Sequence, residues 1–283
     1  MRDRVLILSV LIVASCGLGY ELISSALASY LLGDSILQFS SVIGCYLFAM
    51  GIGSWLSKYV KDEDVLNRFI DVELLVALLG GVSAAVLFLV FAWLSAPFRA
   101  ALYVGVFVIG MMVGMEIPLV MRVFNQRKAE FREIVSRVLT FDYLGALAVS
   151  LVFPLLLAPK LGLLRTSFLF GMLNAGVALW TTWLFRGEIR RPAERAVRGG
   201  VVLGLLALAA GAACAQVPGL PADVVKKLSA DLDATLKSPA VSQKMLDMGV
   251  IPMPLSAQEF KAYAEQERSA WADVIKKAGI KLE

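Results

Sequence analysis

Seven long apolar stretches fill the first 215 residues of this chain, and each is long enough to cross a lipid bilayer. A transmembrane helix needs about 20 apolar residues. The chain is 59% apolar, more than is usual for a soluble domain. The pattern therefore predicts an all-α polytopic membrane protein, a bundle of about seven transmembrane helices in residues 1–215 with a small, mostly helical tail in 216–283. The predicted spans are 5–32, 36–56, 70–94, 101–121, 139–158, 163–185 and 199–215.

The distribution of lysine and arginine predicts the orientation. With the N-terminus in the cytoplasm, the inner segments of residues 1–215 carry fifteen Lys and Arg residues and the outer loops carry three. This is the positive-inside pattern. Seven spans then place the tail outside the cytoplasm. An alternative is that 199–215 is a signal-like segment, since Arg195 and Arg198 precede it and Ala213-Cys214-Ala215 has the form of a cleavage site. Both interpretations export the tail.

Several classes of function are disfavoured by composition. The chain has no histidine, and its three cysteines lie in apolar stretches without ligand spacing, so no metal site is predicted. No glycine-rich phosphate-binding motif occurs, so no cofactor is predicted. The net charge of +4 comes mostly from the positive-inside pattern and indicates no nucleic-acid partner. The predicted partner is the lipid bilayer.

Four carboxylates lie in or near the apolar stretches, where a charge costs about 2.5–3.5 kcal/mol at mid-bilayer. One hypothesis is a cation-binding site formed by Glu21, Glu73, Glu116 and Asp142. The alternative for the last three is that they lie at helix ends and pair with Arg68, Arg122 or Arg137. Glu21 lies deeper, and its neighbours Tyr20, Ser24 and Ser25 are its expected hydrogen-bond partners.

Small residues and turn residues predict how the helices pack and connect. Gly110 and Gly114 form a G-x-x-x-G motif, which allows two helices to approach closely. The same role is expected for Gly171 with Ala175 and for Gly17, Gly19, Gly51, Gly53, Gly80 and Gly81. Pro118 and Pro154 are predicted to kink their helices. Gly33-Asp34-Ser35 is predicted to form a tight turn between the first two spans.

Residues 5–205 resemble the membrane region of bacterial membrane-anchored spermidine synthase-like proteins. The resemblance rests on "GYELISSALASYLLGDSILQFSSVIGCYLFAMGIGSWLSKYV", "VELLVALLGGVSAAVLFLVFA", "MEIPLVMR", "VLTFDYLGALAVSLVFPLLLAPKLGLLRTSFLFGMLNA" and "VALW". It implies a membrane module that precedes an aminopropyltransferase domain of Rossmann-like methyltransferase fold. That domain holds a glycine-rich, acidic site for decarboxylated S-adenosylmethionine and a catalytic aspartate. No such motif follows the last span here, so we expect a non-catalytic chain and carry over no catalytic residue.

Residues 217–283 are similar to the C-terminal end of periplasmic receptors of tripartite tricarboxylate transporters. The segment "LPADVVKKLSADLDATLKSPAVSQKMLDMGVIPMPLSAQEFKAYAEQERSAWADVIKKAGIKLE" carries this resemblance. We expect helices over 221–237, from Ser238 and Pro239 to Gly249, and from a Ser256/Glu259 capping box to about 278, with a short strand at 250–253. The receptors' ligand cleft is mostly built from sequence absent here, so no ligand residue is assigned.

These resemblances leave three functional hypotheses. The chain is a spermidine synthase-like membrane module that lacks its catalytic domain, a bundle that binds or transports a polyamine or another cation, or a membrane protein linked to a solute receptor. The join between the two parts is expected to come from a fused or mis-assembled reading frame or from a deletion that joined two neighbouring genes. The alternative is a real product in which the tail is a small exported appendage. Only three basic residues lie in the outer loops, which argues against a tricarboxylate site there.

Overall fold

The computed structural model describes residues 2–93, 98–126, 131–214, 222–247, 253 and 255–277. The chain divides into two compact units, Met1–Ala215 and Gln216–Glu283. The described residues are mostly helical and include no strand. The predicted strand at 250–253 and the helix end at Gly249 lie largely outside the described residues, which here include only Met253.

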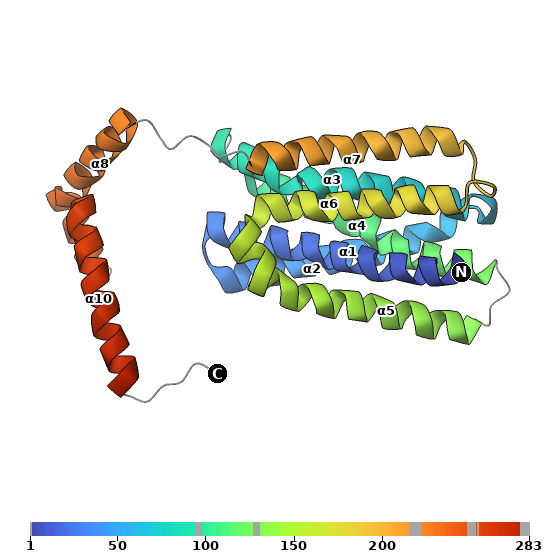
Figure 1. Ribbon diagram of the computed structural model, residues 1–283, viewed down its shortest axis with the longest axis horizontal. Coiled ribbons are helices and arrows are strands. Elements are labelled where there is room, and N and C mark those ends of the chain that lie inside the picture. The colour runs from blue at the N-terminus through green and yellow to red at the C-terminus, as the bar shows by residue number, and fades with distance from the viewer. Residues whose placement is uncertain are drawn as a thin grey trace. The chain divides into compact units, whose positions relative to one another are not determined.

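The first unit is a bundle of long helices (Figure 1). The helices α1 to α7 run in alternating directions, as expected for successive crossings of a membrane. Most of the helices extend beyond the apolar stretch that predicted them, because the polar residues at their ends continue the same helix. Their bounds are α1 Arg2–Leu32, α2 Ser35–Leu56, α3 Val65–Trp93, α4 Phe98–Asn125, α5 Phe131–Val152, α6 Ala158–Leu184 and α7 Pro192–Cys214, with short 3-10 turns at Ser57–Tyr59 and Asp62–Asp64.

Six stretches of helix in the described residues are long and apolar enough to cross a membrane. One of them, Arg132–Leu184, contains two of the predicted spans, the fifth and the sixth. A π-helical turn at Phe153–Leu157 links α5 to α6, and Pro154 lies within it. Gly162 then takes a non-helical conformation with φ 75° and ψ 169°. Figure 1 shows α5 and α6 running in opposite directions, so the chain reverses near this glycine.

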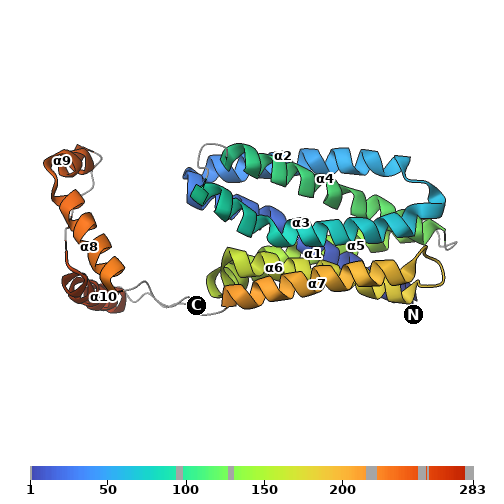
Figure 2. The same cartoon turned by 90° about the horizontal axis from the view of Figure 1, so that it is seen from above.

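The helix α1 lies at the centre of the bundle and contacts α2, α3, α4, α5 and α6. Its fully buried side chains include Cys16, Tyr20 and Leu27. The helix α7 packs against α3 and α6, and Leu206 is buried in that contact. Figure 2 shows α2 and α4 side by side along one edge of the bundle. Many outward side chains of these helices are apolar, including Phe48, Leu89, Leu151 and Leu208. A surface of this kind is suited to contact with lipid.

Glycines make the closest helix contact, between α2 and α4. A Cβ added at Gly53 would overlap the backbone carbonyl of Met111, and one added at Gly114 would overlap the backbone of Met50. The predicted role of the G-x-x-x-G motif is therefore confirmed. Close approach is also found at Gly17, Gly19, Gly80, Gly81, Gly110 and Gly171. The prediction is wrong for Gly51, which faces open space because it lies on the outer side of α2.

The turn between α1 and α2 is built as predicted. Gly33 has φ 72° and Asp34 has φ 47°, a left-handed conformation that glycine and aspartate tolerate better than most residues. The Asp34 carboxylate accepts a hydrogen bond of 3.2 Å from the Leu37 amide and caps α2. The backbone conformation of Gly33 and Asp34 and the Asp34 cap therefore determine the chain reversal between α1 and α2.

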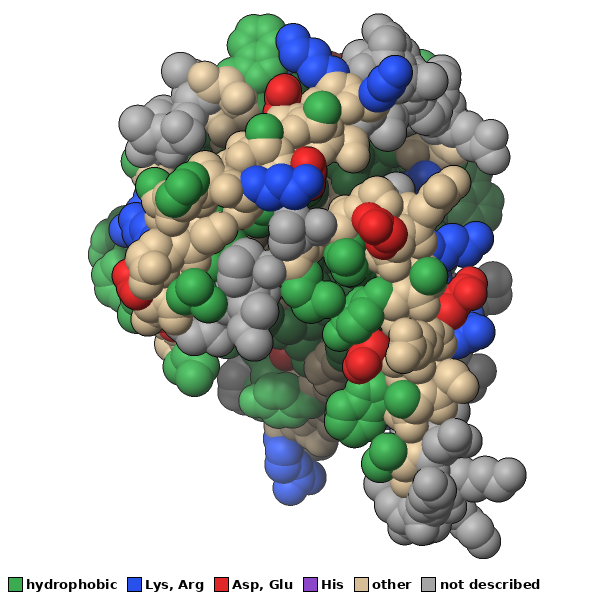
Figure 3. Space-filling view, turned by 90° about the vertical axis from the view of Figure 1, so that its left-hand side faces the viewer, with side chains coloured by type: hydrophobic (Ala, Val, Ile, Leu, Met, Phe, Trp, Pro, Cys, Tyr) green, Lys and Arg blue, Asp and Glu red, His purple; other side chains and the backbone are tan. Residues whose placement is uncertain are grey.

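The described residues of the second unit form three helices, α8 (Ala222–Lys237), α9 (Pro239–Asp247) and α10 (Ala257–Lys277), close to the three predicted. Ser238 caps α9 through its hydroxyl, which accepts a hydrogen bond from the Val241 amide. Large apolar side chains such as Leu232, Phe260 and Trp271 are exposed. In the face seen in Figure 3, acidic and basic side chains are interspersed with apolar ones. The described residues of this unit therefore bury little apolar surface of their own.

The capping box of α10 is present. The Glu259 carboxylate accepts a hydrogen bond of 2.8 Å from the Ser256 amide, and the Glu259 amide donates to the Ser256 hydroxyl. Hydrogen bonding of the Glu259 carboxylate with the Ser256 side chain, and then with the Ser256 backbone amide, lowers the pKa of the Glu259 carboxyl. Because this pKa is lowered, the ionised Glu259 stabilises the helix start at pH values above the usual pKa range of glutamate. That contribution is lost as the pH falls through the lowered pKa.

Ser256→Ala is expected to fray the first turn of α10. Removing an N-cap hydroxyl costs about 1 kcal/mol, which corresponds to a loss of protection of about fivefold for the first-turn amides. Hydrogen exchange of the amides at 258–260 in the whole protein measures this. Ser256→Asn is the matched control because asparagine also caps helices, and it should retain the protection. Equal exchange in all three proteins would contradict the cap.

Candidate functional site

Three of the four predicted site residues line one pocket of about 270 Å³ among α1, α2, α4 and α5. Glu21 comes from α1, Glu116 from α4 and Asp142 from α5. The three lie far apart in the sequence, and the packing of α4 and α5 around α1 brings them together. The described lining includes no lysine or arginine. The pocket therefore combines three acidic groups with no basic residue to neutralise them.

The three carboxylates differ in burial. Glu116 is 1% exposed, Glu21 is 7% exposed, and Asp142 is half-buried. The Oε1 atom of Glu116 is buried and has no hydrogen-bond partner. A buried polar atom without a partner carries a desolvation cost of about 1–3 kcal/mol. Asp142 thus lies nearest to solvent or lipid, and Glu116 presents an unsatisfied acceptor in the interior.

Glu73 is not among the residues that line this pocket. It lies on α3, is fully buried, and neither carboxylate oxygen has a hydrogen-bond partner. Glu116 interacts electrostatically with Glu73 and with Asp142. Glu73 thus belongs to the buried interior of the bundle and not to the pocket lining.

The arginines that were the alternative partners of these carboxylates are engaged elsewhere. Arg122 pairs with Asp62 and donates to the backbone carbonyl oxygens of Ser57 and Val60. Arg137 pairs with Glu133 one turn away. The carboxylate near Arg68 is Asp71, at 4.0 Å. Within the described residues, these arginines thus stabilise loops and helix ends and leave the pocket acidic.

Two of the three expected hydrogen-bond partners of Glu21 do not fill that role. The hydroxyls of Tyr20 and Ser25 are buried without any hydrogen-bond partner, so for these two residues the prediction is wrong. The reason is geometric for Tyr20, because adjacent residues on a helix point in different directions. The Tyr20 ring instead lies close to Gly80 and packs edge-on against Phe170.

Sequence reasoning missed Tyr46, which lines the pocket from α2. Its hydroxyl donates a hydrogen bond of 2.7 Å to the backbone carbonyl oxygen of Gly17 and so joins α2 to α1. It also missed Asn174 and Thr181 on α6, whose buried polar side-chain atoms have no hydrogen-bond partner. The available signal was the same for all three: a polar side chain inside an apolar stretch, as for the four carboxylates.

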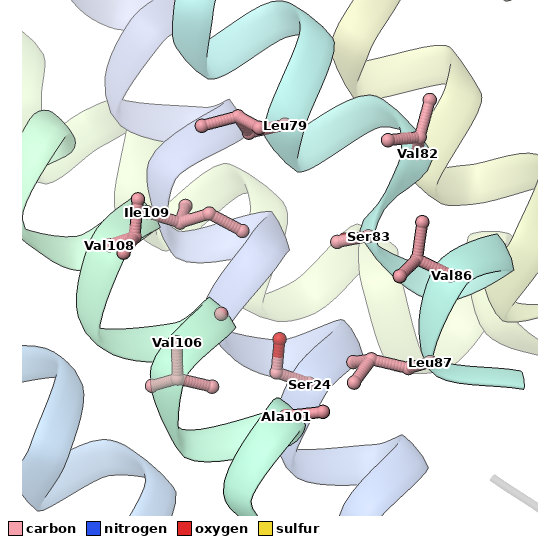
Figure 4. Close-up of a pocket in the computed structure, with 11 residues that line it drawn as sticks. Ser24, Leu79, Val82, Ser83, Val86, Leu87, Ala101, Val106, Val108 and Ile109 are labelled. Carbon is pink, nitrogen blue, oxygen red and sulfur yellow. The ribbon is translucent and has the colours of Figure 1, made fainter. Parts of the chain in front are cut away.

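A second pocket, of about 160 Å³, is lined mainly by apolar side chains of α3 and α4 (Figure 4). Leu79, Val86 and Leu87 of α3 face Val106 and Ile109 of α4. The hydroxyl groups of Ser24 and Ser83 are its polar side-chain groups, and its lining has no titratable residue. We therefore place the candidate functional site at the acidic pocket.

The comparisons with known proteins found no matching family model and no matching solved structure. Among curated proteins, the chain is 69% identical over 187 residues to polyamine aminopropyltransferase 2 of Ralstonia nicotianae, covering 66% of this chain and 37% of that protein. It is 52% identical over 179 residues to the polyamine aminopropyltransferase of Leptospira interrogans, covering 63% and 35%. It is 40% identical over 206 residues to polyamine aminopropyltransferase 1 of Streptomyces coelicolor, covering 72% and 38%.

The chain thus spans little more than a third of the length of these curated relatives. The similarity concerns the N-terminal membrane part, so the resemblance of the tail to solute receptors stays a prediction. The same holds for a fusion or truncation. Over about two thirds of its length, this chain is similar to polyamine aminopropyltransferases.

Proposed function

We propose that this chain is the membrane module of a polyamine aminopropyltransferase-like protein, and that its acidic pocket binds a polyamine. The observation that carries the proposal is the convergence of Glu21, Glu116 and Asp142 on one pocket without a basic residue in its described lining. Carboxylates placed in an apolar bundle usually face a bundle interior or a wet cavity and take part in function. The role proposed here is binding, and we assign no catalytic residue to the chain.

A polyamine fits both kinds of wall in this pocket. Its ammonium groups need acidic partners, and the methylene chains between them need apolar surface. The carboxylates provide the first, and side chains such as Val13, Leu18 and Val113 provide the second. A small inorganic cation would use the carboxylates and gain nothing from the apolar wall. The names of the similar proteins also point to polyamines.

We further propose a location in the bacterial plasma membrane with seven spans, a cytoplasmic N-terminus and a periplasmic tail. The apolar helices of the first unit and the excess of basic residues on one side support this orientation. The helix α7 is 23 residues long and packs against α3 and α6, which favours a span over a signal-like segment.

The binding proposal predicts that Glu21→Gln together with Glu116→Gln weakens spermidine binding strongly. Each substitution removes a charged acceptor with little change in size. A hydrogen bond to a charged group contributes about 1.5–3 kcal/mol, so we expect at least about a tenfold loss per carboxylate. Calorimetric titration of purified full-length protein in neutral detergent measures the dissociation constant.

The matched control is Glu133→Gln, which removes an exposed carboxylate of α5 that pairs with Arg137. This variant should bind spermidine as the parent protein does. Unfolding temperatures of all variants verify that the bundle is intact. The proposal fails if the parent protein binds no spermidine, or if the double variant and the control bind equally well.

A further inference from the structure

A separate pocket, of about 320 Å³, lies where the α6–α7 loop and the start of α7 meet the first turns of α3. Its lining consists almost entirely of charged side chains of both signs, unlike the linings of the two pockets described above. Three carboxylates, Asp64, Asp71 and Glu194, are present with a larger number of arginines. The five lining arginines are Arg68, Arg190, Arg191, Arg195 and Arg198.

Two of the arginines hold the pocket together. The guanidinium of Arg195 donates two hydrogen bonds to the Asp71 carboxylate, at 3.1 and 3.2 Å, and its side chain is 13% exposed. Arg190 pairs with Asp64 at 3.0 Å. The Arg190 amide donates to the side-chain oxygen of Asn67 at 2.9 Å. These contacts fix the loop and the start of α7 against α3.

The other three arginines have spare capacity. Arg68 reaches Asp71 only at 4.0 Å, and Asp71 is already held by Arg195. Arg191 and Arg198 share a single carboxylate, that of Glu194. A guanidinium has five N–H donors in a fixed planar arrangement, which matches the oxygens of a phosphate group. The pocket therefore has more positive charge and more donors than its own carboxylates use.

The position of this pocket favours a lipid as the source of the phosphate. It lies within the first turns of two apolar stretches, Asp62–Trp93 and Pro192–Cys214, which are both long enough to cross a membrane. Lipid phosphates lie at this level of a transmembrane helix. Further along α7, Val197, Val201 and Leu205 are exposed and offer apolar surface for acyl chains. Basic pockets between transmembrane helices bind anionic head groups in this way.

We propose that this arginine-rich pocket binds the phosphate group of an anionic phospholipid. Arg68, Arg191 and Arg198 contact the phosphate, while Arg190 and Arg195 act as positioning residues through their bonds to Asp64 and Asp71. The lipid would then join α3 to the α6–α7 loop at the membrane surface. This site is separate from the acidic pocket and takes a ligand of opposite charge.

The test measures lipid binding to the purified full-length protein by native mass spectrometry. Phosphatidylglycerol should bind more tightly than phosphatidylcholine, which has the same phosphate but no net charge. Arg68→Gln together with Arg198→Gln should weaken phosphatidylglycerol binding by about fivefold per arginine. Glu194→Gln should strengthen it, because it removes the carboxylate that holds Arg191 and Arg198. The matched control is Arg137→Gln, on α5, which should leave binding unchanged.

Opposite effects of the arginine and Glu194 variants cannot come from general damage to the fold. The proposal is overturned if phosphatidylglycerol is not preferred, or if the double arginine variant binds it as the control does. Inorganic phosphate identifies the source of the ligand. If phosphatidylglycerol stays bound in excess inorganic phosphate, the ligand is a lipid. If it is fully displaced, the proposal of a lipid is wrong and the pocket binds a soluble phosphate compound.

Discussion

Gly53→Ala is expected to destabilise the helical bundle by about 1–3 kcal/mol, although alanine is the better helix former. In the interior of a helix, alanine is favoured over glycine by about 0.5–1 kcal/mol. At Gly53 the added methyl group would overlap the backbone carbonyl of Met111, and a backbone atom cannot rotate away as a side chain can. Overpacking of this kind costs about 1–3 kcal/mol or more and should outweigh the gain.

The same helix offers the matched control. Gly51 has no atom within 4 Å of an added methyl group, so Gly51→Ala should be neutral or slightly stabilising. In thermal unfolding experiments in detergent, the midpoint temperature of Gly53→Ala should therefore fall, and that of Gly51→Ala should rise slightly or stay unchanged. Equal midpoints would mean that α2 and α4 do not pack as closely as described.

Separation of α2 from α4 should also affect the acidic pocket. Tyr46 and Met50 of α2 line it opposite Glu116 of α4. Spermidine binding by Gly53→Ala should therefore weaken even at temperatures where the bundle remains folded. Gly51→Ala should bind as the parent protein does.

Much of the fold could be predicted because its signals are local. The apolar stretches predict the long helices, and Asp34 and the Ser256/Glu259 pair predict the helix starts at which they are found. The positions at which the helices begin and end were harder to predict from the sequence. The helix α7 begins at Pro192, seven residues before the predicted span, because Glu194, Arg195 and Arg198 form ion pairs while still helical.

The candidate site could be predicted only in part. Each carboxylate is conspicuous in an apolar stretch, but its direction depends on how the helices rotate and cross. Glu73 and Glu116 have the same sequence signal, and only Glu116 lines the pocket. The arginine-rich pocket was missed because the positive-inside pattern already explained the presence of its arginines in the sequence. Their clustering depends on the α6–α7 loop meeting α3.

The proposed topology predicts that Lys160→Cys is labelled from outside the cell and Gly187→Cys only after the membrane is made permeable. Both positions are exposed in the structure, Lys160 near the start of α6 and Gly187 just beyond its end. A single straight helix over the 53 residues Arg132–Leu184 would be about 80 Å long, against a hydrocarbon core of about 30 Å. The reversal near Gly162 removes this mismatch, and in the proposed topology Lys160 then lies outside. A membrane-impermeant thiol reagent measures the accessibility.

The experiment needs a background without reactive native thiols. Cys16 is buried, whereas Cys45 is half-buried and Cys214 is exposed, so the last two are first replaced by serine. Lys261→Cys in α10 reports on the tail and should also be labelled from outside, because seven spans end there. If Gly187 and Lys261 exchange their expected accessibilities, the stretch from Arg132 to Leu184 crosses only once. The tail then lies in the cytoplasm, and the arginine-rich pocket cannot form, because the start of α3 and the start of α7 lie on opposite sides of the membrane.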